Sequence, residues 1–330
     1  MQTLGVPGLQ MVTFDRSGIR SMVEAGFSDL SRTKRVDSLT LFQAASISKA
    51  VTTIGALRLV EKGLLHLDWD VNDKLSGWKI PLNRYTRVRP VTLREILTHS
   101  AGLSVSGFLG YARGAPLPTL RQCLDGLLPA NNAPIRVTSV PGGRFRYSGG
   151  GFVVLQLVME DAAGERFGRI MKRLVLRPGG MLSSRFSQPL ERRLWPRAAV
   201  AYDARCAAVS GGWHNYPELA AAGLWTTATD LAKLGVEIIR DVSGASDRLL
   251  SPHMARQMIA RQKGHMGLGW GIFHRGRYTT FEHSGGNVGY RCHLCCSIDG
   301  PGVAVMTNSD AGEPLISSLL ESVMGMAKRR

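Results

Sequence analysis

The feature that most constrains the fold is the placement of extended segments at both ends of the chain, with helical patterns between them. Residues 9–14 and 19–26 have the pattern of strands joined by a turn at residues 15–18 (DRSG), and residues 268–273, 279–283, 289–297 and 303–307 have the pattern of further strands. We therefore predict an α+β fold in which one antiparallel sheet is built from both chain termini and is covered by helices.

Helical patterns fill most of the chain between these strands. Apolar periodicity predicts helices from Ser46 to about Gly63, from Thr92 to residue 97, and over residues 153–163, 229–240 and 314–327. In the first helix, apolar residues recur at helical spacing at positions 47, 51, 54, 57 and 60. Thr92 followed by Glu95 has the spacing of a capping box.

Ser46 and Lys49 lie one helical turn apart at the start of the first helix, after a short apolar strand that is predicted to begin at Leu41. A serine hydroxyl becomes a good nucleophile when a neighbouring base accepts its proton, and a desolvated lysine can be that base. The same Ser-x-x-Lys tetrad begins at Ser31 and Ser76, but only Ser46 is followed by a helical apolar pattern. The alternative is that Ser46 merely caps the helix and Lys49 is solvated.

Acyl transfer also needs a group that moves protons and donors that stabilise an oxyanion. Tyr147 lies in a glycine-rich segment before a predicted helix, and a nearby cation such as Lys49 can lower a tyrosine pKa enough to make it a base. His283 ends a predicted strand and precedes Gly285 and Gly286, which allow a substrate backbone to approach closely. The alternative for each of these residues, taken alone, is a packing role.

The chain is expected to form one catalytic domain with two lobes. Residues 1–100 and 231–330 would form the sheet lobe, which carries Ser46 and His283. Residues 101–230 would form an inserted, mostly helical and loop-rich lobe that carries Tyr147. A catalytic cleft is expected between the two lobes.

In chain order, Ser-x-x-Lys at Ser46, Tyr-Ser-x at Tyr147 and His-x-Gly at His283 resemble the three motifs of the serine β-lactamase and penicillin-binding-protein superfamily. The amino-acid sequence around these motifs is most similar to the CubicO-type branch of the superfamily, which includes class C β-lactamase-like esterases and D-amino-acid peptidases. The matching segments are LFQAASISKAV, LREILTHSAGL, PGGRFRYSGGGFVVLQLVMED, AAGLWTTATDLAKL, MGLGWGIF and EHSGGNVGYRC. They lie within residues 6–309, so the resemblance implies a β-lactamase/transpeptidase-like fold.

The resemblance implies a role at each matching position. Ser46 would be the acylated nucleophile, Lys49 would take or relay its proton, and Tyr147 would act with Lys49 as general base and acid. The backbone N–H groups of Ser46 and Gly286 would form the oxyanion hole. His99 matches a family element with an implied structural role. The implied substrate-binding residues are His283, Ser284, Gly285 and Gly149.

The chain departs from the family pattern at two places. Many relatives have an asparagine where this chain has Gly149, and its amide contacts the substrate. No lysine is followed by Ser or Thr, so the Lys-Thr-Gly motif, whose lysine is associated with a β-lactam carboxylate, is absent. Both departures favour an esterase, amidase, peptidase or acyltransferase over efficient β-lactam hydrolysis. The absence of Gly-x-Ser-x-Gly argues against an α/β-hydrolase.

Three functions are consistent with these observations. The leading hypothesis is a serine hydrolase that cleaves a small ester or amide through an acyl-Ser46 intermediate. The alternative is an acyltransferase of the same fold that passes the acyl group to an amine or alcohol in biosynthesis. A catalytically inactive binding module with a basic surface is the third hypothesis, and the intact Ser46, Lys49 and Tyr147 argue against it.

Composition limits the partners. The formal net charge of the 330 residues is +16, but the basic residues are scattered, as on solvated faces, so no nucleic-acid partner is expected. No apolar run reaches the ~18 residues that span a membrane, and no phosphate-binding loop indicates ATP. We expect a small-molecule ester or amide substrate, no cofactor and no metal.

The first residues lack a secretory pattern, which favours a cytoplasmic location, with a trimmed secreted or periplasmic form as the alternative. The oligomeric state is left undetermined.

The cysteines and the large aromatic residues have competing interpretations. The chain has 5 cysteines, an odd number that does not suggest a disulfide framework. Cys292 and Cys295 would point to opposite faces of a strand, which favours buried thiols over a metal site. Four aromatic residues can either line the pocket or pack in the core: Trp213, Trp225, Trp270 and Tyr290.

Overall fold

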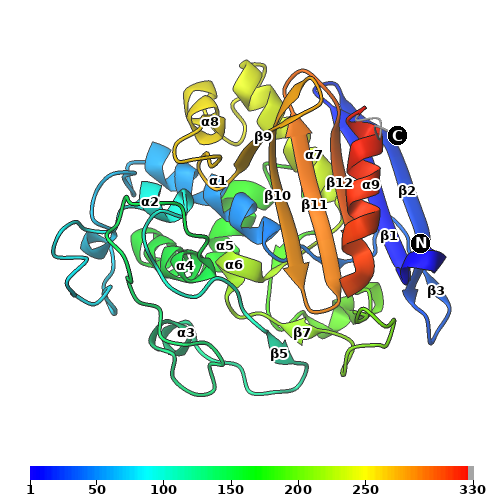
Figure 1. Ribbon diagram of the computed structural model, residues 1–330, viewed down its shortest axis with the longest axis horizontal. Coiled ribbons are helices and arrows are strands. Elements are labelled where there is room, and N and C mark those ends of the chain that lie inside the picture. The colour runs from blue at the N-terminus through cyan, green and yellow to red at the C-terminus, as the bar shows by residue number, and fades with distance from the viewer. Residues whose placement is uncertain (326–330) are drawn as a thin grey trace.

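The computed structural model describes residues 1–325, and its central feature is a seven-stranded sheet with the order β3-β2-β1-β12-β11-β10-β9 (Figure 1). Its strands are β1 (Gly8–Asp15), β2 (Gly18–Asp29), β3 (Lys34–Arg35), β9 (Gly271–Arg275), β10 (Tyr278–Asn287), β11 (Tyr290–Ser297) and β12 (Gly302–Thr307). β1 and β12 pair antiparallel, with Leu9 opposite Thr307, so the two ends of the chain meet in the sheet. The predicted α+β fold is confirmed.

Helices surround this sheet and fill the middle of the chain. The α-helices in the described residues are α1 (Ile47–Glu61), α2 (Leu93–Leu97), α3 (Leu120–Asp125), α4 (Gly149–Ala163), α5 (Phe167–Met171), α6 (Leu219–Ala222), α7 (Ala228–Ser243), α8 (Pro252–Ile259) and α9 (Glu313–Val323). Shorter helical turns are η1 (Gln2–Leu4), η2 (Val71–Asp73), η3 (Lys172–Leu176), η4 (Arg192–Arg197) and η5 (Asp310–Gly312). Within residues 1–325, no helix is both long enough and apolar enough to cross a membrane.

The two faces of the sheet are covered by different helices. α7 packs against β1, β11 and β12, whereas α9 packs on β11 and β12 from the other face, as Figure 1 shows. Side chains along β11 alternate accordingly: Cys292 and Cys296 join the main core, and Cys295 packs with Ile316 and Leu320. The predicted opposite orientation of Cys292 and Cys295 is confirmed.

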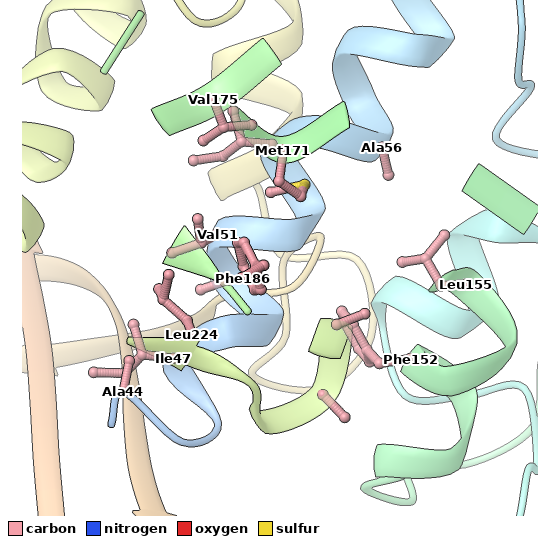
Figure 2. Close-up of a cluster of buried hydrophobic side chains, with 14 of the residues drawn as sticks. Ala44, Ile47, Val51, Ala56, Phe152, Leu155, Met171, Val175, Phe186 and Leu224 are labelled. Atoms are coloured by element: carbon pink, nitrogen blue, oxygen red, sulfur yellow. The ribbon is translucent and has the colours of Figure 1, made fainter. Parts of the chain in front are cut away.

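Helix α1 is buried on nearly every side, including positions outside the apolar pattern of its sequence. Its residues from Ile47 to Leu57 are all buried, and apolar side chains of α4, α5 and β8 surround it (Figure 2). Small residues allow this close packing: a Cβ atom at Gly55 would lie 2.6 Å from the Met171 sulfur. A helix that packs on all sides makes a rigid base for residues at its N-terminus.

The short apolar strand predicted from Leu41 is confirmed as β4 (Phe42–Gln43), whereas the other short strands were not predicted, because two or three residues carry no periodic signal. Strand β4 forms one sheet with β8 (Leu224–Thr226) and β6 (Arg185–Phe186), and β5 (Tyr111–Ala112) and β7 (His214–Asn215) form another. Strand β4 pairs with β8 and leads directly into α1.

Several predicted boundaries shift by a few residues. The helix predicted over residues 229–240 is α7, which begins at Ala228 with Thr227 as its cap and ends at Ser243. Helix α1 ends with Lys62 as C-cap, followed by Gly63 at φ 71°. The helix predicted over residues 314–327 ends at Val323, and residues 326–327 lie outside the described residues. The capping box of Thr92 and Glu95 is confirmed. The division into two lobes at residues 100 and 231 stays a prediction.

Candidate active site

Ser46 stands at the turn between β4 and α1. The Ala44 N–H donates to the Leu224 carbonyl over 2.8 Å, which fixes the end of β4, and Ala45 takes a left-handed φ of 46° before the helix starts. Such a conformation costs a non-glycine residue about 1 kcal/mol or more, so the surrounding packing must enforce it. Ser46 is the N-cap residue, yet its side chain makes no capping hydrogen bond. Its hydroxyl is partly exposed and is left for other partners.

The Lys49 side chain lies beside this hydroxyl. Lys49 Nζ donates to Ser46 Oγ over 3.0 Å and to the Ala221 carbonyl over 2.8 Å. The side chain is 2% exposed, so it is not the solvated lysine of the alternative interpretation. Nζ also lies 5.1 Å from the centre of the Tyr147 ring and 5.9 Å from that of Phe152. The structure therefore brings Ser46, Lys49 and Tyr147 together.

His99 holds the backbone on both sides of Tyr147. The Arg146 N–H donates to the His99 carbonyl over 2.7 Å, and the Ser148 N–H donates to His99 Nδ1 over 3.1 Å. The His99 and Tyr147 ring centres are 4.3 Å apart. Burial, and secondarily the charge of Lys49, hold the pKa of His99 well below its usual value, so this imidazole is neutral.

Gly149 begins α4 where the resemblance leads one to expect an asparagine. A Cβ atom there would lie 3.0 Å from both the Phe108 ring and the Ser106 carbonyl oxygen. The Gly149 N–H donates to the same Ser106 carbonyl over 3.1 Å. The loop before β5 thus occupies the space that a longer side chain would need.

Strand β10 brings His283, Ser284, Gly285 and Gly286 against the Ser46 turn. A Cβ atom at Gly285 would lie only 2.4 Å from the Ala44 carbonyl oxygen, so glycine allows β10 and the turn to touch. Gly286 pairs with Arg291 of β11. The oxyanion hole formed by the N–H groups of Ser46 and Gly286 stays a prediction.

His283 is a neutral side chain in this wall. It is 8% exposed, and its Nδ1–H donates to the Ser284 carbonyl over 2.6 Å. Burial, followed by the nearby Lys49, lowers the pKa of His283 to about 3. His283 therefore carries no charge at neutral pH, unlike a lysine in the same place.

Sequence reasoning missed two parts of the site. The first is the Ala221 carbonyl, which orients Lys49 although its side chain is only a methyl group. The second is a hollow of about 280 Å³ beside Tyr147 and His283. Its other lining residues include Phe145 and Phe273, which the sequence separates widely. Phe273 lies beside the hollow because β9 pairs with β10, and a prediction of this strand pairing could have located it.

The remaining candidates lie outside the site. The four aromatic residues with open assignments are all core residues, exposed by at most 3%: Trp213, Trp225, Trp270 and Tyr290. Burial raises the pKa of the Cys292 and Cys295 thiols. Among residues 1–325, no group of three His, Cys, Asp or Glu side chains is arranged to hold a metal ion.

Comparison with known proteins places this geometry in a family. The Mycobacterium tuberculosis protein Rv1367c is 28% identical over 294 residues, which cover 79% of this chain and 71% of that protein. Esterase EstB of Burkholderia gladioli is 30% identical over 165 residues, covering 47% and 41% of the two chains. The structure of the D-amino acid amidase from Ochrobactrum anthropi SV3 has a TM-score of 0.80 at 17% identity, covering 98% and 96%. The profile of the Beta-lactamase family matches residues 1–318, and the chain therefore belongs to that family of serine hydrolases.

Proposed function

We propose that this protein is a serine hydrolase that cleaves a small ester or amide through an acyl-Ser46 intermediate. The observation that carries the proposal is the 3.0 Å contact between Lys49 Nζ and the uncapped Ser46 hydroxyl. A buried amine at this distance is within reach of the proton that the serine must lose. The kinship with Esterase EstB supports an ester substrate.

The proposed reaction uses each of these groups in turn. Ser46 Oγ attacks the carbonyl carbon while its proton passes to the Lys49–Tyr147 pair. The N–H groups of Ser46 and Gly286 stabilise the oxyanion of the tetrahedral intermediate. When the intermediate collapses, Tyr147 donates a proton to the leaving oxygen or nitrogen, and the leaving group departs. Water then attacks the acyl-Ser46 ester by the reverse proton movements and releases the acid.

Two features favour esters and unactivated amides over β-lactams. His283 is neutral where a lysine would pair with a β-lactam carboxylate, and Gly149 offers no side-chain amide to an acylamido group. We therefore infer slow β-lactam turnover. The same residues also serve transfer of the acyl group to an alcohol or amine, because only the nucleophile of the second step differs.

Labelling with a fluorophosphonate, read by intact-protein mass spectrometry, tests the proposal. We expect one adduct on the wild-type protein and none on Ser46→Ala. Ser31→Ala and Ser76→Ala are matched controls, because each removes the serine of another Ser-x-x-Lys tetrad. Labelling that survives in Ser46→Ala would exclude Ser46 as the nucleophile. Product analysis with p-nitrophenyl acetate, with and without an added alcohol, then identifies the acyl acceptor.

A further inference from the structure

The hollow beside Tyr147 and His283 has an apolar wall made of aromatic rings. The His265 ring lies between Phe145, with ring centres 4.9 Å apart, and Phe273, with ring centres 5.1 Å apart. Met266 also lines the hollow. An engineered cavity of roughly 150 Å³ holds benzene, so a hollow of about 280 Å³ has room for a substituted aromatic ring.

The charged side chains that line the hollow are paired with one another. Arg275 Nε donates to both carboxylate oxygens of Glu282, over 3.1 and 2.9 Å, and its terminal nitrogen donates to Oε1 over 2.9 Å. His293 Nε2 lies 2.9 Å from the second oxygen. The charges of Arg275 and Glu282 therefore cancel within the wall, and neutral His283 adds none.

The residues that line the hollow indicate which part of the substrate it would hold. Tyr147 lines it, whereas Ser46 and Lys49 do not. In the proposed function, on which this inference rests, Tyr147 gives its proton to the departing oxygen. A group that lies in the hollow is therefore on the leaving-group side of the scissile bond, and the acyl group lies elsewhere.

We propose that this hollow binds the leaving group and that the leaving group is an uncharged aromatic alcohol. In the acylation step, the bond between Ser46 Oγ and the acyl carbon forms, and the bond between that carbon and the aromatic alcohol's oxygen breaks. The electron pair of the broken bond stays on that oxygen, which takes the proton from Tyr147. An anionic leaving group is disfavoured, because aromatic rings line one wall of the hollow and the Arg275 guanidinium in the lining is already bound to Glu282.

The test uses acetate esters that differ only in the alcohol: ethyl acetate, benzyl acetate, 4-carbamoylbenzyl acetate and 4-carboxybenzyl acetate. The three benzyl alcohols have similar acidity, so differences among them report binding rather than leaving-group chemistry. We expect kcat/KM for 4-carboxybenzyl acetate to be roughly tenfold or more below that for the carbamoyl ester, as for a carboxylate desolvated against aromatic rings. Equal values for these two esters overturn the inference.

Two variants sharpen the test. Phe273→Ala should lower the ratio of kcat/KM for benzyl acetate to that for ethyl acetate roughly tenfold, because only the benzyl ring would contact Phe273. Phe273 is half-exposed at 38%, so this change is tolerated by the fold, and Phe27→Ala in β2 is the matched control. His283→Lys should raise the ratio of 4-carboxybenzyl to 4-carbamoylbenzyl hydrolysis. An equal loss for benzyl and ethyl acetate in Phe273→Ala contradicts the proposal.

Fluorophosphonate labelling separates this inference from the proposed function. If Ser46 is labelled but the neutral benzyl esters are not preferred, the assignment of the hollow is wrong and the serine hydrolase proposal stands. If Ser46 is not labelled, the proposed function itself fails. Labelling together with preference for the neutral benzyl esters supports both.

Discussion

At the scale of single residues, Lys49 is the group whose position matters most. It reaches Ser46 Oγ and the Ala221 carbonyl from a buried site, and two aromatic rings lie within 6 Å of its nitrogen. We predict that Lys49→Ala lowers kcat about 10²- to 10⁴-fold, the usual contribution of a general base. Stopped-flow acylation with p-nitrophenyl acetate measures the effect.

The control for this prediction is Lys62→Ala, which removes an exposed lysine at the other end of the same helix. Circular dichroism of both variants separates a chemical effect from unfolding. A folded Lys49→Ala variant that acylates at the wild-type rate would assign the proton transfer to another group, with Tyr147 the first to examine.

His99 gives a second prediction at this scale. It contacts Tyr147 through its ring and holds the backbone before and after it. We predict that His99→Asn lowers kcat roughly tenfold with little change in KM, because a misplaced proton donor affects the transition state more than binding. Asparagine tolerates the left-handed φ of 54° found here, so backbone strain is not added.

His66→Asn is the matched control for His99→Asn, since His66 is an exposed histidine stacked on Trp69. The prediction concerns a positioning residue, so the division between kcat and KM is the decisive readout. An unchanged kcat in folded His99→Asn, or a loss confined to KM, contradicts it.

At the scale of elements, the capping boxes can be compared within the chain. Thr92 caps α2 and is 5% exposed, and α2 leads directly to His99. Thr119 caps α3 with the same pattern, in an exposed position. We predict that Thr92→Ala destabilises the fold by about 1–2 kcal/mol and Thr119→Ala by about 0.5 kcal/mol, because a buried N–H left without a partner costs more than a solvated one. Urea unfolding of both variants measures the difference, and equal costs would show that burial is not the cause.

The elements also show how far sequence reasoning reaches. The long strands and the hairpin turn at residues 15–18 were predicted because alternation and turn residues are local signals. The Ser46–Lys49 pair was predicted because helical spacing is local too. The Ala221 carbonyl and the Arg275–Glu282–His293 network were not, because each depends on which distant segments pair. The all-round burial of α1 was missed because small residues such as Gly55 give no apolar pattern.

At the scale of the whole molecule, the candidate site gathers segments that are far apart in the chain. Ser46 comes from the turn before α1, Tyr147 from the segment before α4, and His283 from β10, while the Lys49 partner Ala221 belongs to α6. Such a site forms only when these segments have packed together. A buried polar group near one of them therefore affects both the stability of the molecule and the geometry of the site. Glu218, the residue that precedes α6, is such a group.

Glu218 makes the stability of the molecule depend on pH. Its side chain is fully buried, the Cys123 thiol donates to Oε1 over 3.6 Å, and Oε2 has no hydrogen-bond partner among residues 1–325. Burial raises the pKa of Glu218 from 4.5 to about 7. Because the folded state holds this proton more tightly than the unfolded chain, the stabilisation is complete below pH 4.5 and is lost as the pH rises through about 7.

We therefore predict that the wild-type protein loses up to about 3 kcal/mol of unfolding free energy between pH 5 and pH 8 from this one group. Glu218→Gln keeps the shape of the side chain but cannot ionise, so its stability should change less over this range and should exceed that of the wild type at pH 8. Glu24→Gln, at an exposed position of β2, is the control. Urea unfolding at pH 5 and pH 8 measures the effect. Parallel pH dependences for wild type and Glu218→Gln would mean that the carboxyl ionises in the folded state at little cost, and α6 would then hold its place beside Lys49 independently of Glu218.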